Sequence, residues 1–133
     1  EIEKKIFGDE LSVSEIPEFW NDRMEQLVGV RPTKDSQGVL QDTHWSSGLF
    51  GYFPTYTLGN LVSAIIASKM RKDLDGYEED IKKGNFESIR KWLRLKIHQH
   101  GSVYAPKVLL SNTLNEGYNP NYFVNYIETK YLG

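Results

Sequence analysis

The sequence predicts an all-α fold of about five to seven helices, and three observations support this prediction. Apolar residues recur at intervals of three and four through most of the chain, as in helices that bury one face. No segment alternates apolar and polar residues as a half-buried strand does. The 133 residues, 39% of them hydrophobic, suffice for one core, so we expect residues 1–133 to form a single domain.

The first expected helix lies at the start of the sequence. Ile2 and Ile6 share one helical face, and Gly8 is a suitable end for the helix. No residue that could cap the helix precedes Glu1. We therefore expect the tail of a helix whose beginning lies outside this sequence.

The second expected helix ends near residue 29. Ser14 is expected to cap it, Pro17 lies in its first turn, and Gly29 ends it. Its predicted apolar stripe contains five residues: Ile16, Phe19, Trp20, Leu27 and Val28.

The remaining expected helices lie in the second half of the chain. A long helix is predicted from about Thr57 to about Asp73, followed by one or two polar turns over residues 77–84. Asn85 can cap the next helix, and Pro106 and Pro120 each suit the first turn of a further helix. The predicted buried face of the helix after Asn85 consists of Phe86, Ile89, Leu93 and Ile97.

Composition excludes several classes of function. The net charge of -2 provides no basic field for nucleic acid or an anionic membrane. Cysteine is absent, which rules out disulfides and thiolate metal sites and favours a cytoplasmic location. No apolar run approaches the roughly 20 residues of a membrane span, and the charged first residues are not a signal peptide. We expect neither nucleic acid nor membrane as a partner.

A complete metal or catalytic centre is not visible in the sequence. His98 and His100 lie two apart at a helix end, where their side chains point in different directions, so we interpret them as cations near a helix C-terminus or as core contacts, not as metal ligands. The sequence contains no H-E-x-x-H, no phosphate-binding glycine motif and no G-x-S-x-G. We expect no metal ligands within this chain.

Residues 38–60, GVLQDTHWSSGLFGYFPTYTLGN, combine glycines and aromatic residues in a short stretch. Asp42 lies two residues before His44 and can fix the tautomer of that ring. Tyr52 and Tyr56 are one helical turn apart, just ahead of a long helix. The stretch is consistent with one wall of a site, but also with an ordinary tight connection that holds a capping Asp and core aromatics. Spacing alone leaves both interpretations open.

The run GVLQDTHW, followed by SSGLFGYFPTYTLGN, resembles the G-x-x-Q-D-x-H-W signature of the thermostable (Taq-type) metallocarboxypeptidases. These are metal-dependent enzymes that remove C-terminal amino acids from peptides. The segments SEIPEFWNDRMEQLVGV, IRKWLRLKIHQHGSVYAPKVLL and NPNYFVNYIETKY are also similar to parts of that family. The resemblance covers essentially the whole chain, but only roughly the C-terminal quarter of a longer, mainly helical family polypeptide. It implies a C-terminal fragment of a larger helical metallopeptidase.

The resemblance also implies where the metal lies. In the family, zinc or another divalent metal is held by an H-E-x-x-H helix and a later glutamate, all upstream of the region seen here. We therefore expect this fragment to be inactive alone, with the missing N-terminal portion, a peptide substrate and a second copy in a homodimer as its partners. The alternative is a non-catalytic helical interaction module that lacks the catalytic part.

The resemblance further implies candidate site residues. Gln41, Asp42, His44 and Trp45 coincide with the family signature. We expect His44 to stabilise the oxygen of the scissile carbonyl as it gains negative charge. Gln41, Asp42 and Trp45 are expected to form the substrate wall, with Asp42 orienting a neighbour and Trp45 packing the loop.

A tyrosine is the expected second donor, by analogy with helical metallopeptidases that use a His followed by a Tyr. We prefer Tyr56 to Tyr52 for this role. Gly48 and Gly51 are expected to let the backbone pass closely. We also expect exposed apolar patches around the first helix and over residues 45–58.

Overall fold

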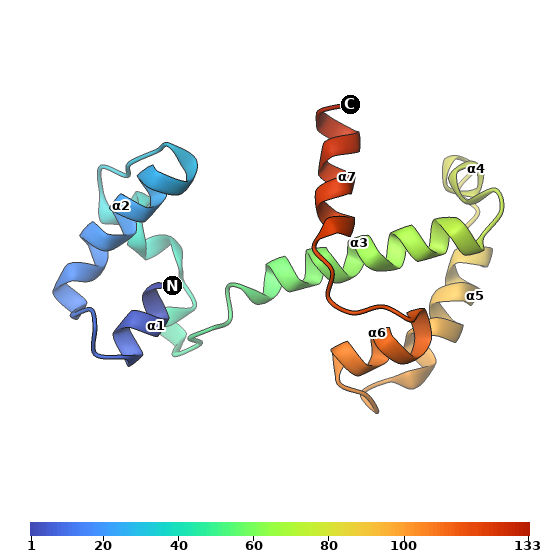
Figure 1. The fold of residues 1–133 in the computed structure, drawn as a ribbon, viewed down its shortest axis with the longest axis horizontal. Helices are drawn as coiled ribbons and strands as arrows, with labels where there is room; N and C mark the ends of the chain where they lie inside the picture. Colours follow the sequence, from blue (N-terminus) through green and yellow to red (C-terminus); the bar gives the residue numbers. More distant parts are fainter. The chain divides into compact units, whose positions relative to one another are not determined.

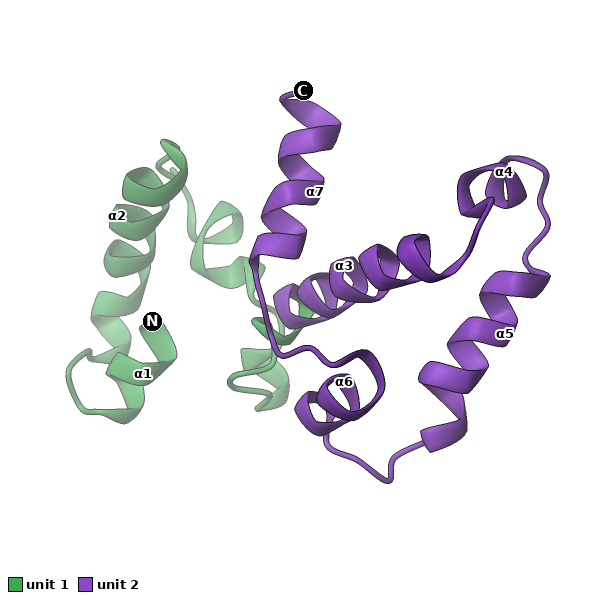
Figure 2. Cartoon of the chain, turned by 45° about the vertical axis from the view of Figure 1, so that its right-hand side comes forward, with its two compact units in different colours: residues 1–56 green, residues 57–133 purple.

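The computed structural model describes all residues from 1 to 133 and confirms the all-α prediction (Figure 1). It contains seven α-helices and five short 3-10 turns, and no strand. Contacts divide the chain into two compact units, residues 1–56 and 57–133, which Figure 2 shows in different colours. That residues 1–133 act as a single domain remains a prediction. No helix combines the length and the apolar character that crossing a membrane requires.

Unit 1 is built from α1 (Ile2–Phe7), α2 (Ile16–Val28) and a chain of 3-10 turns. The turns cover Val13–Glu15, Asp35–Gln37, Val39–Gln41 and Trp45–Ser47. As predicted, Pro17 lies in the first turn of α2, where its missing N–H costs nothing. Gly29 ends the helix in a left-handed conformation, with φ of 74°, which glycine adopts readily.

The predicted cap of α2 was wrong by two residues. A 3-10 turn precedes the helix, and Ser12, not Ser14, stands at its start. The backbone N–H of Ser12 donates to Glu15 Oε2 at 3.0 Å, which completes a capping box. The cap lies earlier because the extra turn continues into α2 without a break.

The predicted apolar stripe of α2 is buried only at its beginning. Ile16 belongs to the core of unit 1, whereas Leu27 and Val28 are exposed. In the first half of α2, Trp20 packs edge-on against Trp45 with ring centroids 6.2 Å apart.

Arg31, just beyond α2, joins three acidic side chains of that helix. Its guanidinium contacts Glu18, Asp22 at 2.6 Å and Glu25 at 3.0 Å. These acids are spaced four and three residues apart, so they lie on one face of the helix. The hydrogen bonds that Arg31 donates to Asp22 and Glu25 raise the pKa of its guanidinium, which stays fully charged. The chain leaving α2 is thereby folded back along the helix.

Gly38 allows the segment that begins the candidate site to pass close to α2. A Cβ at this position would lie 3.0 Å from Asn21 Oδ1 and 3.2 Å from Pro32 Cβ. The proline carbon belongs to a rigid ring and cannot yield easily. Glycine at position 38 therefore permits residues 39–45 to pack against the first half of α2.

Unit 2 contains the five remaining helices, except that the first two residues of α3 belong to unit 1. The helices are α3 (Thr55–Asp73), α4 (Tyr77–Lys82), α5 (Glu87–Lys96), α6 (Pro106–Leu114) and α7 (Asn121–Tyr131). Their starts and ends agree with the sequence prediction to within a few residues. The core of unit 2 consists of Ile65, Met70, Trp92, Leu110 and Leu114, contributed by α3, α5 and α6.

The buried face of α5 differs from the prediction at two positions. Phe86 is exposed, and Trp92 occupies the core instead. Trp92 lies three residues after Ile89 and next to Leu93, so it shares their side of the helix. Its indole Nε1–H donates to Asp73 Oδ2 at 2.8 Å, so the one polar atom of the buried side chain has a hydrogen-bond partner.

A cluster of three polar side chains holds α7 to the rest of unit 2. The Tyr122 hydroxyl donates to Glu116 Oε2 at 2.6 Å, and Lys69 Nζ lies 3.3 Å from the same oxygen. Tyr122 and Lys69 hold the pKa of Glu116 below its usual 4.5. The bond to Glu116, followed by burial, raises the pKa of Tyr122. Desolvation lowers the pKa of Lys69, but its interactions with Glu116 and Tyr122 outweigh that effect and raise it overall.

This cluster predicts how stability changes with pH. The contribution of Glu116 is complete above pH 4.5, its unfolded pKa, and is lost as pH falls through the lower folded pKa. The contributions of Tyr122 and Lys69 are complete below 10.0 and 10.5, and are lost as pH rises through their higher folded pKa values. Glu116→Gln should therefore lower Tm most between these limits. Thermal melts of both proteins from about pH 3 to about pH 11 measure this.

The pH dependence separates a charge effect from a loss of packing. In acid, the protonated Glu116 of the wild type resembles glutamine, so the Tm difference should shrink. Glu79→Gln is a suitable control because it removes only an exposed ion pair with Lys82. A Tm difference for Glu116→Gln that stays constant across the pH range would contradict the prediction.

Candidate functional site

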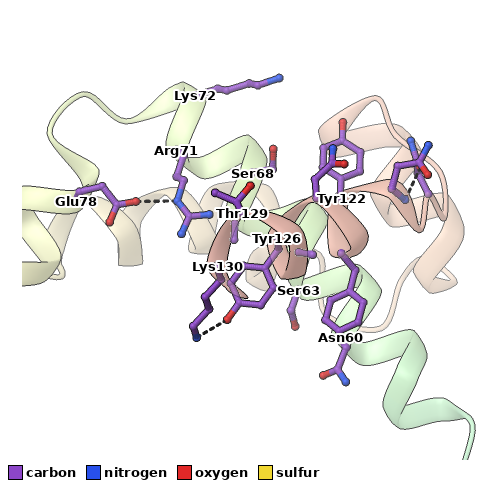
Figure 3. A pocket seen from close by; sticks show the side chains of 16 residues that line it. Asn60, Ser63, Ser68, Arg71, Lys72, Glu78, Tyr122, Tyr126, Thr129 and Lys130 are labelled. Carbon is purple, nitrogen blue, oxygen red and sulfur yellow. Dashed lines mark hydrogen bonds and ion pairs between the residues drawn. The ribbon is translucent and has the colours of Figure 1, made fainter. Parts of the chain in front are cut away.

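Unit 2 holds a groove of about 1180 Å³ between α3 and α7 (Figure 3). Three of its charged side chains, Arg71, Glu78 and Lys130, already have partners within the chain. Arg71 Nε donates to Glu78 Oε1 at 2.8 Å, and Lys130 Nζ donates to the Tyr126 hydroxyl at 2.8 Å, as the dashed lines in Figure 3 show. No histidine lines the groove, and it contains none of the predicted site residues.

Unit 1 brings Asp42 and His44 together, as their spacing predicts. The His44 ring lies with Nδ1 2.8 Å from Asp42 Oδ1, and the backbone N–H of His44 donates to the same oxygen at 3.1 Å. Because a carboxylate can only accept, Nδ1 carries the proton. The other ring nitrogen, Nε2, has no hydrogen-bond partner in the chain and is available to a ligand.

The local backbone fixes the position of His44. The 3-10 turn Val39–Gln41 leads to Asp42, which is only 9% exposed, and His44 stands at the start of the turn Trp45–Ser47. The carbonyl of His44 accepts hydrogen bonds from the N–H groups of Ser47 and Leu49, both at 3.0 Å. Both backbone polar groups of His44 are thus bonded, so its backbone is fixed and its side chain starts from a defined position.

Three aromatic rings surround the imidazole of His44. The ring centroids of Tyr52, Phe53 and Tyr56 lie 5.0, 5.6 and 5.9 Å from the centroid of the His44 ring. These residues lead into α3, where the N–H of Thr55 donates to the Tyr52 carbonyl at 2.9 Å. The His44 side chain is left 19% exposed. The ring is therefore surrounded by three tilted aromatic rings and remains partly open to solvent.

The two candidate tyrosines are both near His44 and both accessible. Tyr52 is 45% exposed and Tyr56 is 57% exposed, and neither hydroxyl has a partner in the chain. Their own rings pack edge-on, with centroids 5.7 Å apart. The geometry brings Tyr52 closer to His44, so it does not by itself favour the preferred Tyr56.

Gln41 and Trp45 do different things in the structure. Gln41 is exposed, and its side-chain amide donates to the Ser36 carbonyl at 2.5 Å, so it braces the preceding turn. Trp45 packs between Trp20 and Phe50, with its ring centroid 6.3 Å from that of Phe50. The expected packing of the loop by Trp45 is present, whereas contact of either residue with substrate remains a prediction.

The expected role of Gly48 and Gly51 was wrong in its mechanism. A Cβ at either position would meet no atom within 4 Å, so neither glycine serves a close approach. Both have positive φ, 69° and 75°, in the left-handed region that other residues rarely adopt. The two glycines turn the chain so that residues 44–52 fold back on themselves.

Apolar side chains are exposed where they were predicted. They gather on α1 and on residues 45–58, and comprise Phe7, Leu49, Phe50, Tyr52, Phe53, Tyr56 and Leu58. Two of them, Phe7 and Phe50, pack edge-on with centroids 5.1 Å apart, which continues the aromatic surface from α1 to the loop. Exposed apolar area of this kind is typical of a surface that meets a ligand or partner.

The residues of this chain do not fit a metal centre. No three His, Asp or Glu side chains come together in a group that could hold an ion. Asp42 and His44 form a pair, and the next nearest groups to His44 are aromatic rings. The arrangement instead provides two phenol hydroxyls, which can donate to a carbonyl oxygen, and one oriented imidazole, whose Nε2 can donate only when both ring nitrogens carry a proton.

Two residues of the site were not predicted. Phe53 packs on His44 and could have been found from its place between the two candidate tyrosines. Glu3 contacts the loop from α1, where its Oε1 accepts the indole N–H of Trp45 at 2.8 Å and the backbone N–H of Gly51 at 2.8 Å. Nothing in the local sequence signals a contact across more than forty residues.

The family model described as carboxypeptidase Taq (M32) metallopeptidase matches residues 1–131. Thermostable carboxypeptidase 1 of Pyrococcus furiosus is 46% identical over 131 residues, which are 98% of this chain and 26% of that protein. Carboxypeptidase 1 of Bacillus subtilis is 39% identical over the same shares. The chain therefore spans about a quarter of the length of the curated relatives it matches.

Solved structures agree with these matches. The structure of Pyrococcus furiosus carboxypeptidase superposes with a TM-score of 0.94 at 45% identity, over 98% of this chain and 26% of that one. The Trypanosoma cruzi metallocarboxypeptidase 1 structure gives a TM-score of 0.92 at 36% identity, over 99% and 28%. With the signature residues at positions 38–45 and nearly the whole sequence matched, the chain belongs to the carboxypeptidase Taq (M32) metallopeptidase family.

Proposed function

We propose that this chain is part of a metal-dependent carboxypeptidase that hydrolyses C-terminal amino acids from peptides, and that it forms one wall of the substrate groove. The observation that carries the proposal is the oriented imidazole of His44. Asp42 fixes its tautomer, tilted aromatic rings pack around it, and Nε2 is left without a partner. The names of the curated relatives support the substrate class.

The proposed role of this wall is to stabilise negative charge. When a peptide carbonyl becomes tetrahedral, its oxygen gains charge, and a prepositioned donor there is more effective than water because it need not reorient. His44 supplies such a donor from Nε2 when it is protonated, and Tyr56 or Tyr52 supplies a second from its hydroxyl. Gln41, Asp42 and Trp45 hold the wall in shape beside the substrate.

The proposed cofactor is zinc or another divalent metal, bound by residues outside this chain. The proposed surroundings are the cytoplasm, which suits a chain without cysteine, and a homodimer, which the exposed apolar residues of α1 and the loop would support. The 133-residue chain alone is proposed to be inactive.

A paired peptide assay tests the function. The longer polypeptide of which we propose this chain to be part is incubated with a peptide and with its C-terminally amidated twin, and products are read by mass spectrometry. We expect stepwise loss of single C-terminal residues from the free peptide only. Removing metal with a chelator should stop the reaction, and restoring zinc, cobalt or manganese singly should identify the native ion.

The same assay contains the results that would overturn the proposal. Cleavage inside both peptides would indicate an endopeptidase. No cleavage at all, with or without each metal, would favour the alternative of a non-catalytic interaction module.

A further inference from the structure

One carboxylate outside the signature holds both ends of the loop that carries the site. Glu3 Oε1 accepts the Trp45 Nε1–H and the Gly51 N–H, each at 2.8 Å. Trp45 directly follows His44, and Gly51 directly precedes Tyr52. The two bonds therefore fix the residues adjoining His44 and Tyr52, one of the two candidate tyrosines.

The position of Glu3 is itself determined by α1. Glu3 and Phe7 lie four residues apart, on one face of the helix, and Phe7 packs edge-on against Phe50 of the same loop. Glu1 forms an ion pair with Arg23 of α2, with Glu1 Oε2 2.7 Å from Arg23 Nη2. The carboxylate of Glu3 is thus presented to the loop by a helix that is anchored at both ends.

The bonds are of a strong type and have few substitutes. Hydrogen bonds to an ionised carboxylate are shorter and stronger than those between neutral groups. Gly51 has a positive φ and no side chain, so no group of its own can bond its backbone N–H. Without Glu3, the segment between the two bonds would keep its local backbone hydrogen bonds and aromatic contacts but would lose its polar link to α1.

We propose that Glu3 is a positioning residue for the catalytic wall, which acts through Trp45 and Gly51 to hold His44 and Tyr52 in register. This inference rests on the proposed function, because the relative position of His44 and a tyrosine matters only if both act on substrate. Small misplacements of catalytic groups are costly, since about 1 Å can reduce turnover by about 100-fold.

Substitutions of Glu3 in the longer enzyme test this. Glu3→Ala should lower kcat by about 10- to 100-fold and leave KM within about 3-fold, because transition-state contacts are lost and ground-state binding is not. Glu3→Gln should restore kcat to within about 3-fold of wild type, since its amide oxygen can accept both bonds. Glu10→Ala is the matched control, because Glu10 follows the same helix and pairs only with Lys5.

A double-mutant cycle with Trp45→Phe tests whether Glu3 acts through its hydrogen bond with the Trp45 indole. Phenylalanine keeps an aromatic ring but removes the indole N–H, so the double variant should lose less kcat than the product of the two single losses. If Glu3→Ala does not fold, Glu3→Asp replaces it, because its shorter side chain cannot reach both donors. A folded Glu3→Ala or Glu3→Asp variant with wild-type kcat, or fully independent losses in the cycle, would overturn the proposal.

The outcomes also separate this inference from the function beneath it. A kcat that depends on His44 but not on Glu3 would remove only the positioning role. A kcat that does not depend on His44 would remove the proposed catalytic wall, and the role of Glu3 with it.

Discussion

Replacing His44 by alanine in the longer enzyme should lower kcat by about 100- to 1000-fold, while KM changes little. The expected size follows from the charge that develops on the carbonyl oxygen, because one prepositioned donor is worth about 3 to 4 kcal/mol in the transition state. Asp42 fixes the His44 tautomer, so the ring needs no reorientation as the reaction proceeds. Steady-state kinetics on a peptide with a free C-terminus measures kcat and KM separately.

A second histidine provides the control for this substitution. His98 lies in a 3-10 turn of unit 2, outside the site, and His98→Ala should keep kcat within about 3-fold of wild type. Circular dichroism and Tm show whether each variant is folded. A folded His44→Ala enzyme with the kcat of wild type would refute the catalytic assignment.

Two conservative variants decide which tyrosine acts with His44. Tyr52→Phe and Tyr56→Phe each remove one hydroxyl and keep the ring that packs on the imidazole. The preferred assignment expects the larger loss of kcat for Tyr56→Phe. The opposite order would transfer the role to Tyr52, which is closer in the structure, and equal wild-type rates would exclude both hydroxyls.

Replacing Ile65 by alanine should destabilise unit 2 by about 2 to 5 kcal/mol. Ile65 is 0% exposed and lies in the core of α3, α5 and α6, so its loss leaves a cavity that close-packed neighbours fill only in part. Urea unfolding followed by circular dichroism and tryptophan fluorescence measures the change, and Trp92 reports from the same core.

A graded series distinguishes cavity formation from a general loss of hydrophobicity. Ile65→Val removes one carbon and should cost about 0.5 to 1.5 kcal/mol. Leu58→Ala, at an exposed position of the same helix, should change stability by about 0.5 kcal/mol or less. Equal effects of Ile65→Ala and Leu58→Ala would show that Ile65 does not belong to a packed core.

Features set by residues close together in sequence were predictable. Pro17 and Pro106 mark first turns, Gly29 marks a helix end, and the Asp42 and His44 contact follows from a spacing of two. Each of these depends on backbone geometry within a few residues. The function, by contrast, came from the resemblance of the signature, because spacing alone favoured an ordinary structural connection.

Features set by distant packing were not predictable. Trp92 is buried and Phe86 is not, because the partner helices of unit 2 decide which part of the apolar face is covered. Gly48 and Gly51 were assigned a close approach, although their positive φ values are what the loop requires. Glu3 is joined to Trp45 by a fold that no local pattern encodes.

The three acids held by Arg31 give unit 1 a response to dissolved ions that its aromatic end does not share. These exposed attractions fade as ionic strength rises, since screening lengths shrink to about 3 Å at molar salt. Sulfate would act in the opposite sense on the stacked rings near His44, because salting-out ions strengthen apolar association. Concentrated sulfate would thus weaken the ion pairs between Arg31 and α2 while strengthening the packing of the aromatic rings near His44.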